Sequence, residues 1–308
     1  MNTIDSFERE IIYQLTDLKE LLRRLEIKQI SPDQQEKCVF TGAGDSFAAT
    51  MIVEAASNYR IRCIDPSYIR LNPLTVKDRI LYTVSVSGST KANIEAAKIA
   101  KKVALGTIAI TANTNSKLAK ICDQVVELKF RNSGVLTAGS IGFTACMLAC
   151  LLFVKRVHLG NVKDLFRLAR KEADNLKISQ HMFIVGSLLS YPLSMYGCAK
   201  MYEVLGIKAQ YAMLEQFCHM ELFSVKKSDT IMILTNASKE NELYSKLKSA
   251  GYNVYVSKSK GNNLEQKLLY HALFLQLVTL LNAKKQNLRE CYFVRNDKLR
   301  NISSALIY

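Results

Sequence analysis

The eight cysteines of this sequence include no pair at CxxC spacing, and most of them lie within apolar runs. Zinc sites and disulfide frameworks depend on regularly spaced thiols, so the sequence predicts neither. Buried free thiols are the usual state of cysteine in a reducing compartment. Residues 1–20 are amphipathic and charged, unlike a secretory signal. We therefore expect a cytoplasmic protein.

Long apolar segments are also missing. The most apolar stretch, residues 145–154, has ten apolar residues in a row. Spanning a bilayer takes roughly twenty, so we expect no membrane association and instead a buried helix over residues 138–156.

Acidic residues are scarce: 27 Asp and Glu face 42 Lys and Arg, which leaves a formal net charge of +15. The basic residues are spread along the whole chain, without the dense, aromatic-interleaved clusters typical of nucleic-acid surfaces. We expect no nucleic-acid partner. The positive charge favours anionic small molecules such as phosphorylated metabolites.

Nucleotide and metal motifs are absent as well. The turn Gly42-Ala43-Gly44 lacks the third glycine of GxGxxG, because Phe47 occupies that position, and no P-loop Gly-Lys-Ser/Thr follows any strand. Three of the four histidines have no partners at metal-ligand spacing and are expected to be structural: His158, His181 and His271. We expect neither a metal nor any other cofactor.

What is present is a hydroxyl-rich loop at residues 85–90. It follows an apolar run (79–84) typical of a buried strand and precedes a helical pattern (91–102). Unpaired backbone N–H groups and the helix dipole make such a junction suitable for phosphate. Its hydroxyls belong to Ser85, Ser87, Ser89 and Thr90. An ordinary capped helix is the alternative, since Ser and Thr are favoured at caps.

Strand and helix patterns alternate along the chain. After an amphipathic helix over residues 5–26, strands are predicted at 37–40, 60–64, 79–84, 106–111 and 123–129, then at 181–185, 229–234 and 252–257. This order predicts an α/β protein of two tandem units, each a parallel, doubly wound, flavodoxin-like sheet flanked by helices. The predicted divisions are a helical segment (1–36), a phosphate-binding domain (37–160) and a second domain with the C-terminal tail (161–308).

These motifs resemble the phosphosugar isomerases built from two SIS (sugar isomerase) domains. That family includes the isomerase half of glucosamine-6-phosphate synthase and the archaeal phosphoglucose/phosphomannose isomerases. Its phosphate loop reads Ser-x-Ser-Gly-x-Thr, as residues 85–90 do. The resemblance implies tandem SIS domains, phosphate binding by Ser85, Ser87, Ser89 and Thr90, and sugar binding by Gly42, Ala43, Gly44, Asp45, Ser46 and Val135.

The resemblance also implies a catalytic pair, Glu203 and His219, sixteen residues apart. Moving a proton between C1 and C2 of a sugar requires a carboxylate base, and opening the ring requires a second acid–base group, which an imidazole can supply. The family's tail lysine corresponds to Lys298, or in another register to Ser304. Gln216 stands where the family often has glutamate, so the resemblance does not determine which sugar phosphate is the substrate.

The resemblance therefore predicts interconversion of an aldose and a ketose hexose 6-phosphate through an enediol or enediolamine. It also implies a homodimer in which the neighbouring subunit supplies His219. Glucosamine-6-phosphate deamination is an alternative, and so is a non-catalytic phosphosugar-binding or regulatory protein. Glu203 favours an enzyme, because a sensor needs no base.

Overall fold

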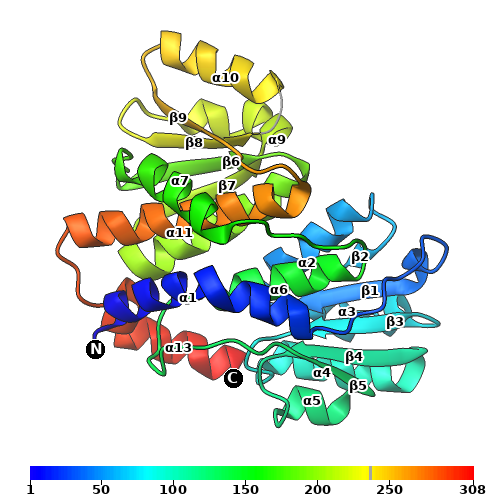
Figure 1. Ribbon diagram of the computed structural model, residues 1–308. Helices are drawn as coiled ribbons and strands as arrows, with labels where there is room; N and C mark the ends of the chain where they lie inside the picture. The colour runs from blue at the N-terminus through cyan, green and yellow to red at the C-terminus, as the bar shows by residue number, and fades with distance from the viewer. Residues whose placement is uncertain (236–237) are drawn as a thin grey trace. The chain divides into compact units, whose positions relative to one another are not determined.

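A computed structural model describes residues 1–235 and 238–308, and for residues 238–240 it describes the backbone alone (Figure 1). The chain forms two compact units that alternate along the sequence. The four-stranded unit contains residues 1–15, 133–140 and 158–297, and the five-stranded unit contains residues 16–132, 141–157 and 298–308. Helix α1 (Thr3–Arg24) therefore contributes residues to both.

The five-stranded unit is built on a parallel sheet with the strand order β2-β1-β3-β4-β5, which is the flavodoxin-like order. Its strands are β1 (Cys38–Gly42), β2 (Arg62–Cys63), β3 (Ile80–Val84), β4 (Gly106–Thr111) and β5 (Gln124–Glu127). Its helices are α2 (Asp45–Ala56), α3 (Pro66–Leu71), α4 (Lys91–Val103), α5 (Lys117–Ile121), α6 (Ile141–Leu152) and most of α13 (Asp297–Ile307).

Both faces of this sheet are buried, which explains why its central strands are continuously apolar. On one face Val39 and Leu81 pack with buried residues that include Ile69 and Ala96, from α3 and α4. On the other, Phe40 stacks on Tyr82 at 4.4 Å between ring centroids, and Phe153 meets both rings edge-on.

Helix α6 is buried almost all round, as its sequence predicts. Across the described residues, no helix combines the length and apolar character needed to cross a membrane.

The four-stranded unit has a parallel sheet with the order β7-β6-β8-β9 (Figure 1). Its strands are β6 (His181–Gly186), β7 (Lys208–Met213), β8 (Thr230–Thr235) and β9 (Asn253–Lys258). Its helices are α7 (Val162–Asp174), α8 (Tyr191–Lys200), α9 (Leu214–His219), α10 (Ser238–Ser249), α11 (Leu264–Lys285) and α12 (Tyr292–Arg295). Phe183 packs with Phe217 of α9, whereas Ile184 faces Gly197 of α8, so both faces are covered here too. The predicted α/β fold with two parallel sheets is confirmed.

Several elements form where the sequence analysis predicts none: strand β7 and helices α3, α9, α12 and α13. Strand β7 lies at a sheet edge and contains no β-branched residue, so its sequence is a weak signal for a strand. In α1 the side chains of Phe7, Ile11 and Leu18 are fully buried, whereas Ile12 is 46% exposed.

All eight cysteines lie in the described part of the chain and are free thiols. Burial raises the pKa of Cys122 to about 11 and that of Cys146 to about 12. Because only the thiolate reacts, we expect these two thiols to resist Ellman's reagent in the native protein at pH 8. In denaturant without reductant, eight thiols should titrate per chain, as in a reduced control. A lower count in the untreated sample would contradict the predicted free-thiol state.

Candidate functional site

The hydroxyl-rich loop connects β3 to α4. In the register of the sheet, Gly42 at the end of β1 pairs with Val84 at the end of β3. The turn at residues 42–46 and the loop at residues 85–90 therefore leave adjacent strands at the same edge. This is the edge at which ligands bind in open parallel sheets.

Gly88 sets the conformation of this loop. Its φ of +63° lies in the left-handed region, and its N–H donates to the carbonyl and the hydroxyl oxygen of Ser85 at 3.2 and 3.1 Å. A Cβ at Gly88 would lie 2.1 Å from Oγ of Ser116. Two further bonds fasten the loop: Leu118 N–H donates to Gly88 at 3.2 Å, and the Thr111 hydroxyl donates to Val86 at 3.1 Å. The loop is thus preorganised, and only glycine fits at its bend.

The outer hydroxyls of the loop face solvent. Ser87 and Ser89 are exposed, and the Ser89 hydroxyl donates to that of Ser87 at 2.8 Å. Ser85 is buried, and its hydroxyl accepts the hydrogen bond from Gly88 within the loop. Thr90 is the N-cap of α4, and its side chain makes no capping hydrogen bond among the described residues. The first N–H groups of α4 therefore lack a side-chain cap and remain available to an anion.

The turn after β1 has a similar local design. Gly42 approaches the backbone of Ser46 so closely that an added Cβ would lie 2.8 Å from its carbonyl carbon. Gly44 is the N-cap of α2 with φ +58°, and Asp45 opens the helix. Together with Ala43, these residues bring backbone and side-chain polar groups to the same sheet edge as the loop.

Glu203 lies at the carboxyl end of α8, where the helix changes to a π-helical turn (Met201–Leu205). Such turns often occur at functional sites. Gly206 ends the turn with φ +69°, and a Cβ there would lie 2.4 Å from the ring of Tyr292. The carboxylate of Glu203 is 36% exposed and so remains accessible to a ligand.

The side chain of Lys200 is fully buried, and its Nζ lies 2.5 Å from Oε2 of Glu203. A buried ammonium is costly unless it is paired, so this contact fixes the orientation of the carboxylate. Lys200 is not singled out by the sequence analysis. The available signal was a lysine three residues before the glutamate, on the same face of a helix whose neighbours are apolar.

His219 is the last residue of α9. Its side chain is 69% exposed, and Nε2 lies 3.4 Å from Oε1 of Glu215.

Val135 is half-buried, and its N–H donates to the Ser133 hydroxyl, which also lies 3.1 Å from the Val135 carbonyl oxygen. Ser133 in turn donates both its N–H and its hydroxyl to Glu10, at 3.0 and 2.8 Å.

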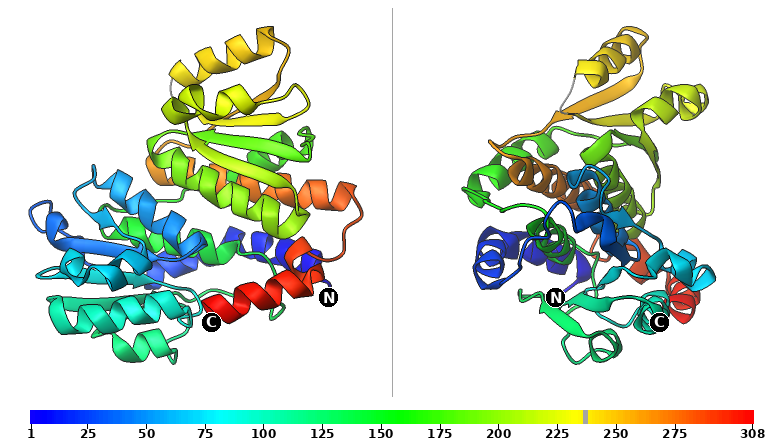
Figure 2. Two further views of the ribbon diagram at one scale, coloured as in Figure 1. Left: turned by 180° about the vertical axis from the view of Figure 1, so that it is seen from behind. Right: turned by 90° about the vertical axis from the view of Figure 1, so that its right-hand side faces the viewer.

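Lys298 and Ser304 are exposed on α13, which is drawn in red. Nζ of Lys91 donates to the carbonyl of Ala305 at 2.8 Å, so the last turn of α13 lies against the start of α4 (Figure 2). Ser304 is next to this contact, whereas Lys298 is at the other end of the helix.

The predicted site residues thus fall into two sets. Glu203, His219 and Val135 belong to the four-stranded unit, and the phosphate loop, the turn at residues 42–46 and Lys298 belong to the five-stranded unit. Within the described residues, no group of His, Cys, Asp and Glu is arranged to hold a metal ion.

Comparisons with known proteins agree with this architecture. No family model matches the chain, and no curated protein sequence matches it. Among solved structures, the chain is similar to the C-terminal domain of glucosamine-fructose-6-phosphate aminotransferase from Francisella tularensis, with TM-score 0.75 and 20% identity over 91% of this chain and 95% of that one.

Two other enzymes are similar. Glucosamine-6-phosphate deaminase from Thermotoga maritima gives TM-score 0.75 and 18% identity over 92% of this chain and 96% of that one. Tagatose-6-phosphate ketose/aldose isomerase from Escherichia coli gives TM-score 0.70 and 14% identity over 93% of this chain and 91% of that one. The resemblance to the SIS-domain phosphosugar isomerases is therefore confirmed for the fold.

Proposed function

We propose that this protein is a SIS-family phosphosugar isomerase that interconverts an aldose and a ketose hexose 6-phosphate. On this proposal, residues 37–160 and 161–308 are tandem SIS domains that follow a helical segment, residues 1–36, except that residues 133–140, 158–160 and 298–308 each belong to the other compact unit. The observation that carries the proposal is the Lys200–Glu203 pair, in which a fully buried ammonium holds a partly exposed carboxylate. A protein that only binds sugars has no need of such a base.

Each group has a role in the proposed reaction. The loop hydroxyls and the first N–H groups of α4 hold the phosphate, and residues 42–46 with Val135 line the sugar. His219 opens the ring by moving a proton to the ring oxygen. Glu203 takes the proton from the carbon beside the carbonyl, which gives an enediol, and returns it to the neighbouring carbon while a proton moves between the two oxygens.

The direct test is an assay of the purified protein with fructose 6-phosphate, with and without ammonia, followed by glucosamine 6-phosphate. Aldose formation without added nitrogen supports the isomerase. The similarity to a deaminase at the same TM-score favours that reaction as the second candidate, and ammonia release from glucosamine 6-phosphate would select it. Binding of these sugars with no turnover would instead indicate a non-catalytic protein and would refute the proposed enzyme.

We further propose a cytoplasmic homodimer in which each site takes His219 from the partner subunit. Exposed apolar side chains surround His219 in sequence: Met213, Met220 and Phe223, the last 84% exposed. Contiguous exposed apolar patches mark protein-binding surfaces. A second copy of the chain would cover them and would bring the imidazole to a neighbouring site.

A mixing experiment tests the shared site. Glu203→Gln and His219→Asn chains are each expected to be nearly inactive alone, but a refolded equimolar mixture should recover about a quarter of the wild-type rate, because half of the dimers then contain one intact site. Each variant refolded by itself is the control. A mixture no more active than its components would show that both groups act within one chain.

A further inference from the structure

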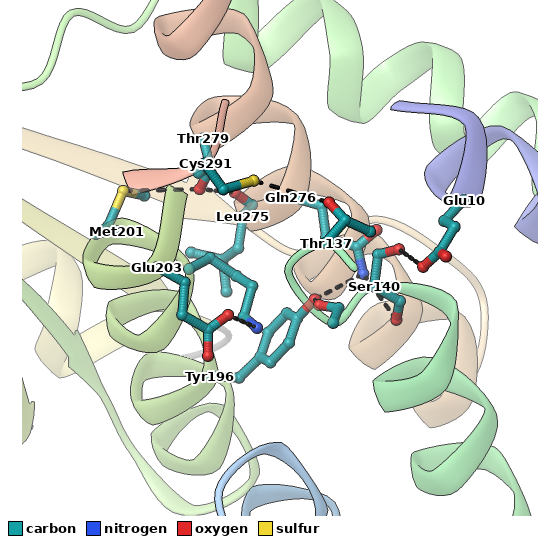
Figure 3. Close-up of polar contacts among 12 residues, drawn as sticks. Glu10, Thr137, Ser140, Tyr196, Met201, Glu203, Leu275, Gln276, Thr279 and Cys291 are labelled. Atoms are coloured by element: carbon teal, nitrogen blue, oxygen red, sulfur yellow. Dashed lines mark hydrogen bonds and ion pairs between the residues drawn. The ribbon is translucent and has the colours of Figure 1, made fainter. Parts of the chain in front are cut away.

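The four-stranded unit contains a buried polar network that the proposed mechanism leaves unused (Figure 3). Its members are almost entirely removed from solvent: Glu10, Gln14, Ser140, Tyr196 and Gln276. Glutamine and glutamate are rarely buried, and a fully bonded network of such groups fixes one arrangement of the elements that it joins.

Gln276 of α11 is at the centre of this network. Its Oε1 accepts from Gln14 at 2.7 Å, while its Nε2 donates to the hydroxyl of Tyr196 at 3.0 Å and to the carbonyl of Ser140 at 3.4 Å. The Tyr196 hydroxyl donates in turn to the carbonyl of Gly139 at 2.9 Å. Tyr196 and Gln276 thereby clamp the end of the 133–140 segment, which also carries Val135.

The ring of Tyr196 faces the ammonium of Lys200, which is paired with Glu203. Nζ of Lys200 lies 5.1 Å from its centroid, within the range of a cation–π contact. The two residues are four apart along α8, so their side chains are neighbours on one helix face. Figure 3 shows the ring of Tyr196 between Glu203 and Ser140.

We propose that Tyr196 is a positioning residue for the isomerase, an inference that rests on the proposed function. Its ring holds the ammonium of Lys200 against Glu203. Its hydroxyl, through Gly139 and Gln276, keeps the 133–140 segment in register with that pair. The proton-transfer base and the segment that carries Val135 are therefore fixed by one side chain.

The test compares Tyr196→Leu, which removes ring and hydroxyl, with Tyr196→Phe, which keeps the ring. Tyr270→Phe is the matched control, because Tyr270 is equally buried in the same unit but its hydroxyl donates to Glu172. We expect Tyr196→Leu to lower kcat about 10- to 30-fold, the loss of a desolvated cation–π contact, with KM changed less than about 3-fold. Tyr196→Phe should restore most of kcat, and Tyr270→Phe should leave kcat unchanged.

A second readout separates this inference from the proposed function. The protonated Nζ of Lys200 should give a ¹⁵N NMR signal protected from exchange, assigned by its loss in Lys200→Met. Tyr196→Leu should shift or broaden that signal, and Tyr270→Phe should not. If the wild type isomerises no hexose 6-phosphate, the proposed function fails while the NMR comparison still tests the contact. A Tyr196→Leu protein with an unmoved signal, or with wild-type kcat and only reduced thermal stability, overturns the inference.

Discussion

Replacing Glu203 with glutamine is expected to lower kcat for hexose 6-phosphate isomerisation by on the order of 10³-fold while leaving phosphosugar affinity nearly unchanged. The amide keeps the shape of the side chain but cannot accept the proton from carbon. The phosphate ligands belong to residues 85–90 and are untouched. Steady-state rates and calorimetric titration with fructose 6-phosphate measure the two effects separately.

The same variant leaves the buried ammonium of Lys200 without its carboxylate, so it should also lower thermal stability. Adding Lys200→Met to Glu203→Gln should restore stability and leave the protein inactive, which separates folding from chemistry. Glu242→Gln is the matched control, because Glu242 forms an exposed ion pair with Lys246 at 2.7 Å. Wild-type rates in Glu203→Gln would remove Glu203 from the mechanism.

Replacing Gly88 with alanine should weaken phosphosugar binding about 100-fold or more. The substitution adds a methyl group where Oγ of Ser116 already lies, and it places a side chain at a positive φ. The loop must then move, so its hydroxyls and the N–H groups of α4 no longer converge on one phosphate. The dissociation constant for fructose 6-phosphate, measured by titration, gives the effect directly.

Two further variants make this result specific. Gly106→Ala adds the same methyl group at the start of β4, where no atom lies within 4 Å, and should leave binding unchanged. Adding Ser116→Gly to Gly88→Ala removes the clash and should recover part of the affinity, although the positive φ still disfavours alanine. Unaltered binding in Gly88→Ala would refute the proposed role of the loop as a phosphate site.

Features set by local pattern can be predicted from the sequence. Strand β4 has the bounds that its sequence predicts, because a continuous apolar run between a helix pattern and a turn has few other interpretations. The positions of the two turns at one sheet edge also follow, since parallel strands place their carboxyl ends together. Strand β7 and helix α13 cannot be predicted in this way. Buried and exposed residues do not alternate regularly along β7, and α13 has no buried residue that could give a helical pattern of apolar positions.

The residues of the candidate site also include some that the sequence identifies and some that only the structure identifies. The phosphate loop is a contiguous motif, so its residues can be identified in the amino-acid sequence alone. Lys200 and Tyr196 owe their significance to burial, and burial is a property of the folded chain. A lysine in a helical pattern is ordinarily expected to be solvated, and only its position beside Glu203 and the tyrosine ring marks it as functional.

The way in which the two units share the chain has a consequence for how the protein is made. Residues 1–15 leave the ribosome before residues 16–132 yet belong to the four-stranded unit, and residues 298–308 follow that unit yet belong to the five-stranded one. No single cut between residues 16 and 297 yields two whole units. Residues 298–308 add only α13, which has no buried residue, so the five-stranded sheet and the helices that cover it are complete once residues 16–157 have been synthesised. The four-stranded unit, in contrast, is complete only when the chain has reached residue 297.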